Sequence, residues 1–385
     1  MSEAAHIPQL RFPEYSANWS QRLLSDFLIP TLREIEKPKV NYLAIGLRSH
    51  CKGTFQKPDS DPSKIAMEKL FRVKENDLIV NITFAWEGAI AIVKENDEGG
   101  LVSHRFPTYT FDTNITSHHF FKHQFINKRF RYLLDLISPG GAGRNRVMSK
   151  KEFVKLKVPL PSVGEQQKIA AFLTAVDNKI EQLSKKQELL GEYKKGLMQQ
   201  IFSQAIRFKA DDGSDFPDWK EKKLGSLCEI TTGKLDANAM VKDGQYRFYT
   251  CAKEYYKIDD YAFDTDALIV SGNGANVGYI HHYQGKFNAY QRTYVLDSFT
   301  DNIVFVKFVL DGYLHKRIMK EKNEGNTPYI VMGTLTDMKI NLPSFSEQTK
   351  ISNFLSSIDN KIEQVGKQLD ESKQFKKALL QQMFV

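Results

Sequence analysis

The sequence has few of the residues and motifs that mark catalysis or metal binding. Its three cysteines, Cys51, Cys228 and Cys251, have the spacing of neither a metal site nor a disulfide framework. No Gly-x4-Gly-Lys-Ser/Thr loop is present, which argues against nucleotide hydrolysis by this chain. No Pro-Pro pair occurs, so the Asn/Asp-Pro-Pro-aromatic signature of adenine-amino methyltransferases is missing. We therefore expect a non-catalytic chain that recognises a partner and binds no metal or cofactor itself.

Long apolar runs are also missing. No stretch approaches the length of a membrane span, and the first residues are polar and carry no visible signal peptide. These features predict a soluble, cytoplasmic protein without a membrane partner. The chain is 41% hydrophobic and 12% aromatic, enough for the cores of two domains. A net charge of +8 and a pI near 9.0 favour a polyanionic partner.

Two local patterns resemble sites but have simpler interpretations. The segment Gly272–Gly278 follows an expected strand, as a phosphate loop would, but Tyr279–Tyr283 after it has the pattern of another strand. The helix N-terminus that would hold a phosphate is therefore missing, and we expect a turn that presents asparagines. His119 and His123 are four residues apart, next to His118, but no zincin glutamate or third ligand accompanies them. A packed or surface cluster is the better interpretation.

The most informative feature present is an internal repeat. The segment Pro161–Gln166 recurs as Pro343–Gln348, and Asp177–Gln182 recurs letter for letter as Asp359–Gln364 at the same shift. Roughly half of the positions over some forty residues are identical, which indicates a duplicated unit. Two copies are too few for a solenoid, so we expect approximate two-fold symmetry within one chain.

Each copy predicts a capped, amphipathic helix. Ser162 with Glu165, and Ser344 with Glu347, have capping-box spacing, in which the serine accepts from the third helical amide and the glutamate reaches back to the serine amide. The apolar positions that we expect to pair the helices and to dock partners are Ile169, Phe172, Leu173, Val176, Ile180, Leu183, Ile351, Phe354, Leu355, Ile358, Ile362 and Val365.

The later turns of both helices follow a heptad seam. Polar residues interrupt this seam at Gln187, Lys194, Ser372 and Lys376. Each helix is the natural antiparallel partner of the other, and one running from residue 176 to residue 203 would be about 42 Å long. The alternative is that both are ordinary core helices of one large domain.

The segments before the helices, residues 19–160 and 219–342, predict mixed α/β modules. Their aromatic and β-branched runs indicate strands at 77–81, 89–93, 266–270 and 293–296. Short helices are expected at 120–137 and 302–320. The two modules align poorly with each other, so they have diverged further than the helices.

The start of the chain echoes the residues that follow the first helix. Ile206-Arg207-Phe208 and then Trp219 are matched by Leu10-Arg11-Phe12 and then Trp19. The N-terminus therefore supplies the continuation that the C-terminal helix lacks. This pattern predicts that the two termini lie close together, and that a circular permutant opened near residues 211–213 folds.

The resulting organisation resembles the specificity subunit of type I DNA restriction-modification systems. The resemblance covers essentially the whole chain and is strongest at Leu160-Pro161, Glu165-Gln166 and their second copies, Leu342-Pro343 and Glu347-Gln348. It implies an α+β and α/β fold: target-recognition domains at 1–160 and 205–342, and conserved helical regions at 161–204 and 343–385. The family fold has two mixed α/β domains joined by two long antiparallel, coiled-coil-like helices.

The resemblance also implies a function. Each recognition domain would read one half of a bipartite, asymmetric site on double-stranded DNA, and the helices would set the unread spacer and dock two methyltransferase subunits. Those subunits would bind S-adenosylmethionine and methylate adenine N6. Motor-nuclease subunits would use ATP and Mg for translocation and cleavage.

Base recognition favours Arg or Lys against guanine and Asn or Gln against adenine, from loops that can enter the major groove. The candidates in the first module are Arg48, Ser49, His50, Lys52, Lys57, Arg144, Asn145 and Arg146. Those in the second are Asn273, Asn276, Gln291, Arg292, Asn326, Thr327 and Tyr329. Lys64 and Lys234 are candidates for phosphate contacts only.

Two other functions are compatible with the sequence. A structural adaptor could bind proteins through its modules and dimerise through its helices, and its binding would not depend on salt as phosphate contacts do. A stand-alone methyltransferase or nuclease with unrecognised motifs would act without partners.

Overall fold

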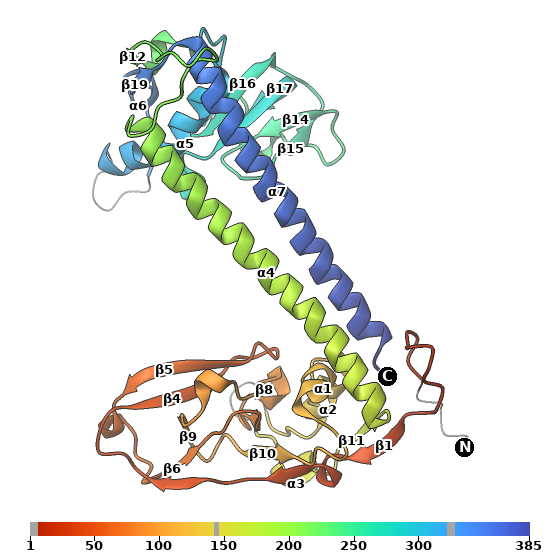
Figure 1. The fold of residues 1–385 in the computed structure, drawn as a ribbon. Coiled ribbons are helices and arrows are strands. Elements are labelled where there is room, and N and C mark those ends of the chain that lie inside the picture. Colours follow the sequence, from red (N-terminus) through yellow and green to blue (C-terminus); the bar gives the residue numbers. More distant parts are fainter. Residues whose placement is uncertain (1–6, 142–145, 322–327) are drawn as a thin grey trace. The chain divides into compact units, whose positions relative to one another are not determined.

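The computed structural model describes residues 7–141, 146–321 and 328–385 (Figure 1). Contacts divide the chain into two compact units. The first contains the residues up to Ser184 and the segment Gln368–Val385, and the second is Lys185–Lys367. Helices α4 (Val163–Phe202) and α7 (Phe345–Gln382) contribute to both units. We call residues 19–160 the first module and residues 219–342 the second module.

The first module is built on three small sheets. Their strand orders are β1-β11, β2-β10-β7-β8 and β3-β6-β9-β4-β5. The strands are β1 (Ser20–Leu23), β2 (Leu28–Pro30), β3 (Glu34–Glu36), β4 (Tyr42–Leu47), β5 (Thr54–Ser60), β6 (Lys69–Arg72), β7 (Leu78–Val80), β8 (Ile90–Ile92), β9 (Leu101–Val102), β10 (Thr108–Phe111) and β11 (Lys157–Leu160). The helices are α1 (His118–Gln124), α2 (Lys128–Leu136) and α3 (Lys150–Phe153).

Strand β7 is buried on both faces, which explains its unbroken run of apolar residues. Leu78 and Val80 pack with Phe120 and Phe121 of α1 in the larger core of the module. Ile79 points the other way and belongs to a second, smaller core. The alternation of side chains along the strand thus links two cores through one short segment.

The second module contains a two-stranded sheet, β12-β19, and a six-stranded sheet of order β13-β18-β16-β17-β14-β15. Its strands are β12 (Lys220–Lys223), β13 (Glu229–Thr232), β14 (Tyr246–Tyr249), β15 (Tyr256–Ile258), β16 (Phe263–Ser271), β17 (Ile280–Ala289), β18 (Thr293–Asp297) and β19 (Lys339–Leu342). Its helices are α5 (Ile303–Glu321) and α6 (Met332–Thr336). Leu268 and Val270 pack against α5 on one face of the larger sheet, and Ala267 and Ile269 lie on the other face.

Each module begins and ends with strands that pair with each other. β1 pairs antiparallel with β11, opposing Ser20 to Leu160, and β12 pairs with β19, opposing Lys220 to Leu342. The tryptophan that precedes each first strand is thereby held next to the Leu-Pro-Ser segment that starts each long helix.

Most predicted elements are confirmed. β7 and β8 lie within the strands expected at 77–81 and 89–93, and β16 and β18 include those expected at 266–270 and 293–296. α5 begins and ends one residue later than the helix expected at 302–320. The helix expected at 120–137 is instead two helices, α1 and α2, since Asn127 caps α2 by accepting from the amide of Arg129. The alternative of one large domain is wrong, because contacts separate two units.

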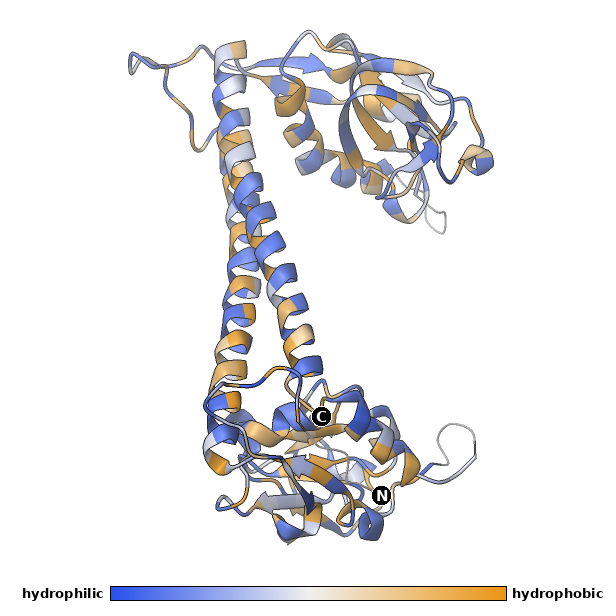
Figure 2. Ribbon diagram, turned by 90° about the vertical axis from the view of Figure 1, so that its right-hand side faces the viewer, coloured by the Kyte–Doolittle hydropathy of each residue, from blue (hydrophilic) through white to orange (hydrophobic). Residues whose placement is uncertain are grey.

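Figure 2 shows hydrophobic and hydrophilic residues alternating along α4 and α7, as expected of amphipathic helices. In the part of the chain that the structure describes, none of the helices combines the length and apolarity that a membrane crossing needs.

Candidate functional site

In the first unit, Glu165 in the first turn of α4 binds the N-terminal segment. Its buried carboxylate accepts hydrogen bonds from Arg11 Nε and Nη2, both at 2.7 Å, and from Trp19 Nε1 at 3.3 Å. The hydrogen bond with Glu165 raises the pKa of Arg11. The amide of Glu165 donates to Ser162 Oγ at 3.4 Å, which confirms the first half of the predicted capping box. The second half is wrong, because the carboxylate binds Arg11 and Trp19 in place of the serine amide.

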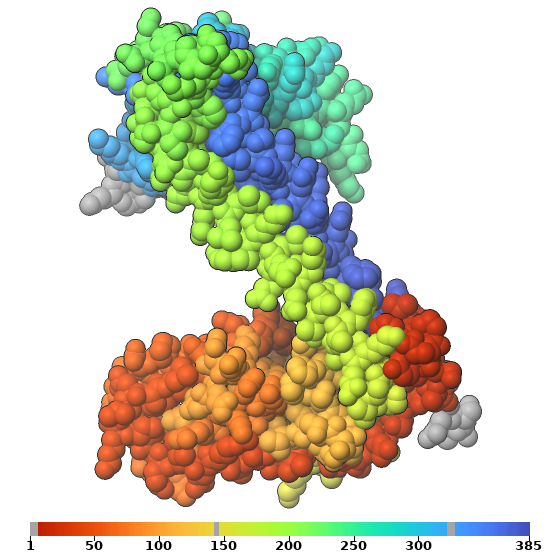
Figure 3. All heavy atoms as spheres, in the orientation of Figure 1, coloured from red at the N-terminus to blue at the C-terminus, as the bar shows by residue number. Residues whose placement is uncertain are grey.

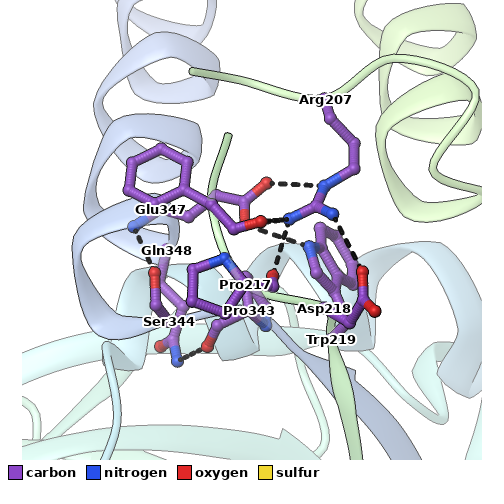
Figure 4. Close-up of polar contacts among 9 residues, drawn as sticks. Arg207, Pro217, Asp218, Trp219, Pro343, Ser344, Glu347 and Gln348 are labelled. Atoms are coloured by element: carbon purple, nitrogen blue, oxygen red, sulfur yellow. Dashed lines mark hydrogen bonds and ion pairs between the residues drawn. The ribbon is translucent and has the colours of Figure 1, made fainter. Parts of the chain in front are cut away.

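Glu347 repeats this arrangement at the start of α7 in the second unit (Figure 4). Arg207 donates to its carboxylate from Nε at 3.3 Å and from Nη2 at 2.9 Å, and Trp219 Nε1 donates at 3.2 Å. The Glu347 amide donates to Ser344 Oγ at 3.4 Å. The hydrogen bond with Glu347 raises the pKa of Arg207. We call these two Arg–Glu–Trp groups the junctions.

The glutamine that follows each glutamate makes the same hydrogen bond in both units. Gln166 Nε2 donates to Pro161 O, and Gln348 Nε2 donates to Pro343 O, both at 3.0 Å. Both glutamines are buried. Each junction therefore fixes the direction in which the chain leaves its module and enters the long helix.

The start and the end of the chain meet within the first unit, as predicted. Leu10 N donates to Gln382 O at 2.9 Å, and Figure 3 shows the N-terminal segment (red) against the beginning of α4. The same contact occurs in the second unit, where Ile206 N donates to Gln200 O at 3.2 Å. The N-terminus thus takes the place of the segment that follows α4.

Ion pairs join the two long helices within each unit. In the first, Lys376 Nζ lies 2.5 Å from Asp177 Oδ1, and in the second, Lys194 Nζ lies 2.6 Å from Asp359 Oδ1. Two of the residues that interrupt the apolar seam are therefore paired across it.

The apolar residues predicted to pair the helices are all at least partly covered. Buried are Ile169, Leu173, Leu183, Ile351, Leu355, Ile358 and Val365, and partly buried are Phe172, Val176, Ile180, Phe354 and Ile362. The first turns of each helix also belong to the core of the adjoining module.

The first predicted recognition loop is the tip of the β4–β5 hairpin. Arg48, His50 and Lys52 are exposed there. Ser49 Oγ donates to Glu87 Oε2 at 2.6 Å, and His50 N donates to Glu87 O at 2.7 Å, so a short 3-10 turn (Ala85–Glu87) fixes the loop. The loop thus presents three exposed side chains that can donate hydrogen bonds, of which Arg48 already donates from Nη1 to Thr54 O at 3.0 Å.

Other predicted residues of this module have different surroundings. Arg146 Nη2 donates to Asp135 Oδ1 at 2.5 Å, and its guanidinium lies 4.9 Å from the Trp86 ring. These contacts occupy part of the guanidinium, while Lys57 is exposed on β5. Arg144 and Asn145 lie outside the described residues.

In the second module, the structure brings together four predicted residues, Asn273, Asn276, Arg292 and Tyr329. Asn273 pairs with Tyr329 in an isolated β-bridge, and Asn276 Nδ2 donates to Cys251 O at 3.1 Å. Cys251 Sγ in turn donates to Arg292 O at 3.4 Å. Gln291 is exposed next to Arg292. Asn326 and Thr327 lie outside the described residues.

The turn predicted at 272–278 is confirmed. A single 3-10 turn (Gly274–Asn276) leads directly into strand β17, where a phosphate loop would lead into a helix. Lys64 and Lys234 are both exposed, as phosphate contacts require.

A cationic and aromatic surface, which no sequence motif indicates, lies beside this turn. It is formed by Arg247, Lys253, Tyr255, Tyr279 and Tyr283. The alternating pattern of Tyr279–Tyr283 predicts a strand, but it does not show which side chains of other strands lie beside it.

Comparisons with known proteins agree with the resemblance. The family described as "Type I restriction modification DNA specificity domain" matches residues 28–190 and 217–372, which is more than half of the chain. The chain is 43% identical over 168 residues to the type I restriction enzyme EcoDI specificity subunit of Escherichia coli, covering 42% of this chain and 37% of that protein. It is 26% identical over 264 residues to the MjaVIII specificity subunit of Methanocaldococcus jannaschii, covering 60% of this chain and 62% of that protein.

A solved structure shares the fold along nearly the whole chain. The S subunit of a type I restriction-modification system from M. genitalium aligns with a TM-score of 0.67 at 17% identity. The alignment covers 98% of this chain and 99% of that one. At this identity the likeness shows the fold alone: two mixed α/β domains with long helices.

Proposed function

Since the chain belongs to the family of type I restriction-modification DNA specificity proteins, we propose that it is the DNA-reading component of a methylating and restricting assembly. Each module reads one half of a bipartite, asymmetric site on double-stranded DNA. The paired helices set the unread spacer and dock two methyltransferase subunits. The chain itself is not catalytic.

The observation that best supports this proposal is the duplicated junction. Two modules of different sequence are attached to corresponding helices through the same Arg–Glu–Trp contacts. The same attachment for two dissimilar modules suits a protein that presents two different recognition domains to one duplex. The exposed donors of Arg48, His50 and Lys52 suit base or phosphate contacts in one half-site, and the group around Asn273, Asn276 and Arg292 suits the other.

The reaction belongs to the partners in this proposal. Methyltransferase subunits bind S-adenosylmethionine and methylate adenine N6, and motor-nuclease subunits use ATP and Mg. This chain selects the site at which they act.

Methylome sequencing tests the proposal. The chain is expressed with its cognate methyltransferase subunit in a host that lacks DNA methylation, and single-molecule sequencing locates N6-methyladenine. We expect methylation in one split motif whose halves have a fixed spacing. A matched variant that joins a foreign second module to the junction at residues 219 and 342 should change one half of the motif only.

Three results would count against the proposal. Methylation or cleavage by the purified chain alone would indicate an enzyme. Protein binding that is insensitive to salt, without methylation by the assembled complex, would favour the adaptor function. A continuous motif in place of a split one would contradict two separate readers.

A further inference from the structure

Among the described residues, no helix contributes to the small core on one face of the six-stranded sheet in the second module. α5 packs against Leu268 and Val270 on one face (Figure 1). The opposite face carries a small core that includes Tyr249, Ile269 and Phe287, and it is formed by residues of the sheet strands themselves. These core side chains are buried, so the residues around them form the accessible part of this face.

Arg247 of strand β14 lies on this face between two aromatic rings. Its Cζ is 4.3 Å from the centroid of Tyr255 and 4.2 Å from that of Tyr283. Its Nη1 donates to the hydroxyl of Tyr249 at 3.3 Å. The rings hold the planar guanidinium in one orientation, which reduces the entropy that a partner must remove on binding.

Among the described residues Arg247 has no carboxylate partner, which is also true of the partly buried Arg131, whereas most of the partly buried arginines have one. Arg11, Arg33, Arg146, Arg207 and Arg317 each form an ion pair with an aspartate or glutamate. Within the described residues, the recorded contacts of the Arg247 guanidinium are all with tyrosines. The positive charge of this partly buried side chain has no counter-charge beside it, so its position favours an anion from outside the chain.

The surroundings of Arg247 are cationic and aromatic. Lys257 Nζ is 5.9 Å from the Tyr255 ring, and Lys253 Nζ is 6.0 Å from the Tyr279 ring. Both tyrosine side chains are exposed, and the acidic neighbour in the same loop is Glu254.

This surface is continuous with the predicted recognition turn. Asn276 Nδ2 binds the carbonyl of Cys251, and the His281 ring binds the carbonyl of Ala252 at 3.1 Å. The loop that carries Lys253 and Tyr255 is therefore attached to the turn that presents Asn273 and Asn276.

We propose that Arg247, clamped by Tyr255 and Tyr283, binds a backbone phosphate of the DNA whose bases the neighbouring turn reads. The inference rests on the proposed function. A phosphate supplies the full negative charge that the guanidinium lacks, whereas a guanine edge is neutral and would leave the charge uncompensated. Arginine matches two phosphate oxygens with two parallel donors.

The test uses the complex of the full chain with its methyltransferase subunit. Fluorescence anisotropy measures its affinity for a duplex with the methylated motif and for a scrambled duplex, at several KCl concentrations. Arg247→Met should weaken binding to both duplexes by a similar factor and should reduce the slope of log K against log salt by about 0.9, the value for one phosphate. Arg247→Lys, which keeps the charge, should lose less DNA affinity than Arg247→Met.

Lys286→Met is the matched control. Lys286 lies on β17, is exposed, and contacts a tyrosine ring, but its position in the strand places it on the opposite face from Tyr283. The substitution removes one positive charge, as Arg247→Met does. It should change neither the DNA affinity nor the salt slope beyond the long-range effect of one surface charge.

Phosphate-ethylation interference on the wild-type complex and on Arg247→Lys provides a second readout. One ethylated phosphate in the half-site of the second module should disrupt the wild-type complex most strongly and should disrupt the variant less. Unchanged affinity and slope for Arg247→Met would overturn the inference. So would a loss confined to one base pair of the motif, which would mark a base contact. If the wild-type complex shows no salt-dependent DNA binding, the proposed function itself fails.

Discussion

The lysines that pair the two helices have different neighbours in the two units. In the second unit, Lys194 binds Asp359, and its Nζ lies 4.9 Å from the Phe308 ring. In the first, Lys376 binds Asp177, and the corresponding position of α1 is His123. The correspondence follows from the tryptophan contacts, because Phe120 meets Trp19, Phe305 meets Trp219, and His123 and Phe308 each come three residues later.

His123 is a poor replacement for phenylalanine in this setting. It is fully buried, and neither ring nitrogen has a hydrogen-bond partner among the described residues. Burial lowers its pKa to about 3, with smaller contributions from Lys122, Lys376 and His119. The duplicated helices have therefore kept their ion pairs, while the modules have changed even in the layer that contacts the helices.

The largest expected effect comes from breaking the junctions. Glu165→Ala leaves Arg11 and Trp19 without their acceptor, and removal of one member of a buried ion pair costs about 3 kcal/mol. Glu347→Ala should cost less, about 2 kcal/mol, because Arg207 is 26% exposed against 11% for Arg11 and is better screened. Hydrogen exchange of the amides in each unit measures the two losses separately.

The control for this comparison is Glu181→Ala, since Glu181 is exposed on α4. It should leave exchange in both units unchanged. A larger loss for Glu347→Ala than for Glu165→Ala would show that the exposure of the arginine does not decide the strength of a junction.

The next effect is a pH dependence confined to the first unit. The folded protein keeps His123 neutral, whereas the unfolded chain protonates it below its ordinary pKa of 6.5. The unfolded state therefore binds more protons at low pH, and stability falls as pH drops from about 6.5 toward 3. Between pH 7.5 and 5.5 this one group should remove about 1.4 kcal/mol from the free energy of unfolding.

His123→Phe should remove that loss, and Phe308→His should introduce it in the second unit. Denaturant unfolding at pH 7.5, 6.5 and 5.5 measures both. Burial also lowers the pKa of His118, to about 4. The free energy of unfolding of His123→Phe should therefore still fall with decreasing pH, but less steeply than that of the wild type. An unchanged slope in that variant would contradict the assignment to His123.

Smaller effects are expected from the helix-pairing lysines. Lys194→Met and Asp359→Asn, singly and together, define a double-mutant cycle, and Lys376→Met with Asp177→Asn defines its counterpart. The side chains are 19% and 42% exposed in one pair and 24% and 32% in the other, so each coupling energy should be about 0.5 kcal/mol. Coupling that differs between the units by more than 1 kcal/mol, measured by thermal unfolding, would refute the equivalence of the two pairs.

The repeat, the long helices and most strands could be predicted because their signals are local. Hydrophobic periodicity and the Leu-Pro-Ser segments that start the helices can each be recognised from residues that are neighbours in the sequence. The true partners of Glu165 could not be predicted in this way because they lie far away, with Arg11 154 residues earlier in the sequence. No local pattern records such a pairing.

The same limit applied to the recognition surfaces. The turn before β17 could be predicted from its own residues. The engagement of Arg146 by Asp135, and the clamp around Arg247, depend on which segments fold against each other. Strand β14 pairs parallel with β17, a long-range pairing that the local sequence does not specify.

The smallest expected effect is that of a circular permutant, which tests whether the chain ends truly replace the linker after α4. Leu10 and Ile206 form corresponding backbone contacts, and five residues, 201–205, separate Gln200 from Ile206. Joining Val385 to Gln9 through one glycine reproduces that length between Gln382 and Leu10. Glycine is chosen because Gln204, at the matching position, has a φ of 60°, which proline at position 8 could not adopt.

The new ends are placed at the exposed turn between Asp211 and Gly213. Because the aromatic contact of Phe12 with Phe172 repeats that of Phe208 with Phe354, the joined segment should keep its packing. We expect a permutant whose melting temperature and methylation motif match those of the wild-type complex. A permutant with proline in place of the glycine is the control and should be destabilised, since it forces a strained φ at the join. Loss of folding in the glycine version would show that the two linkers are not equivalent, despite their matching contacts.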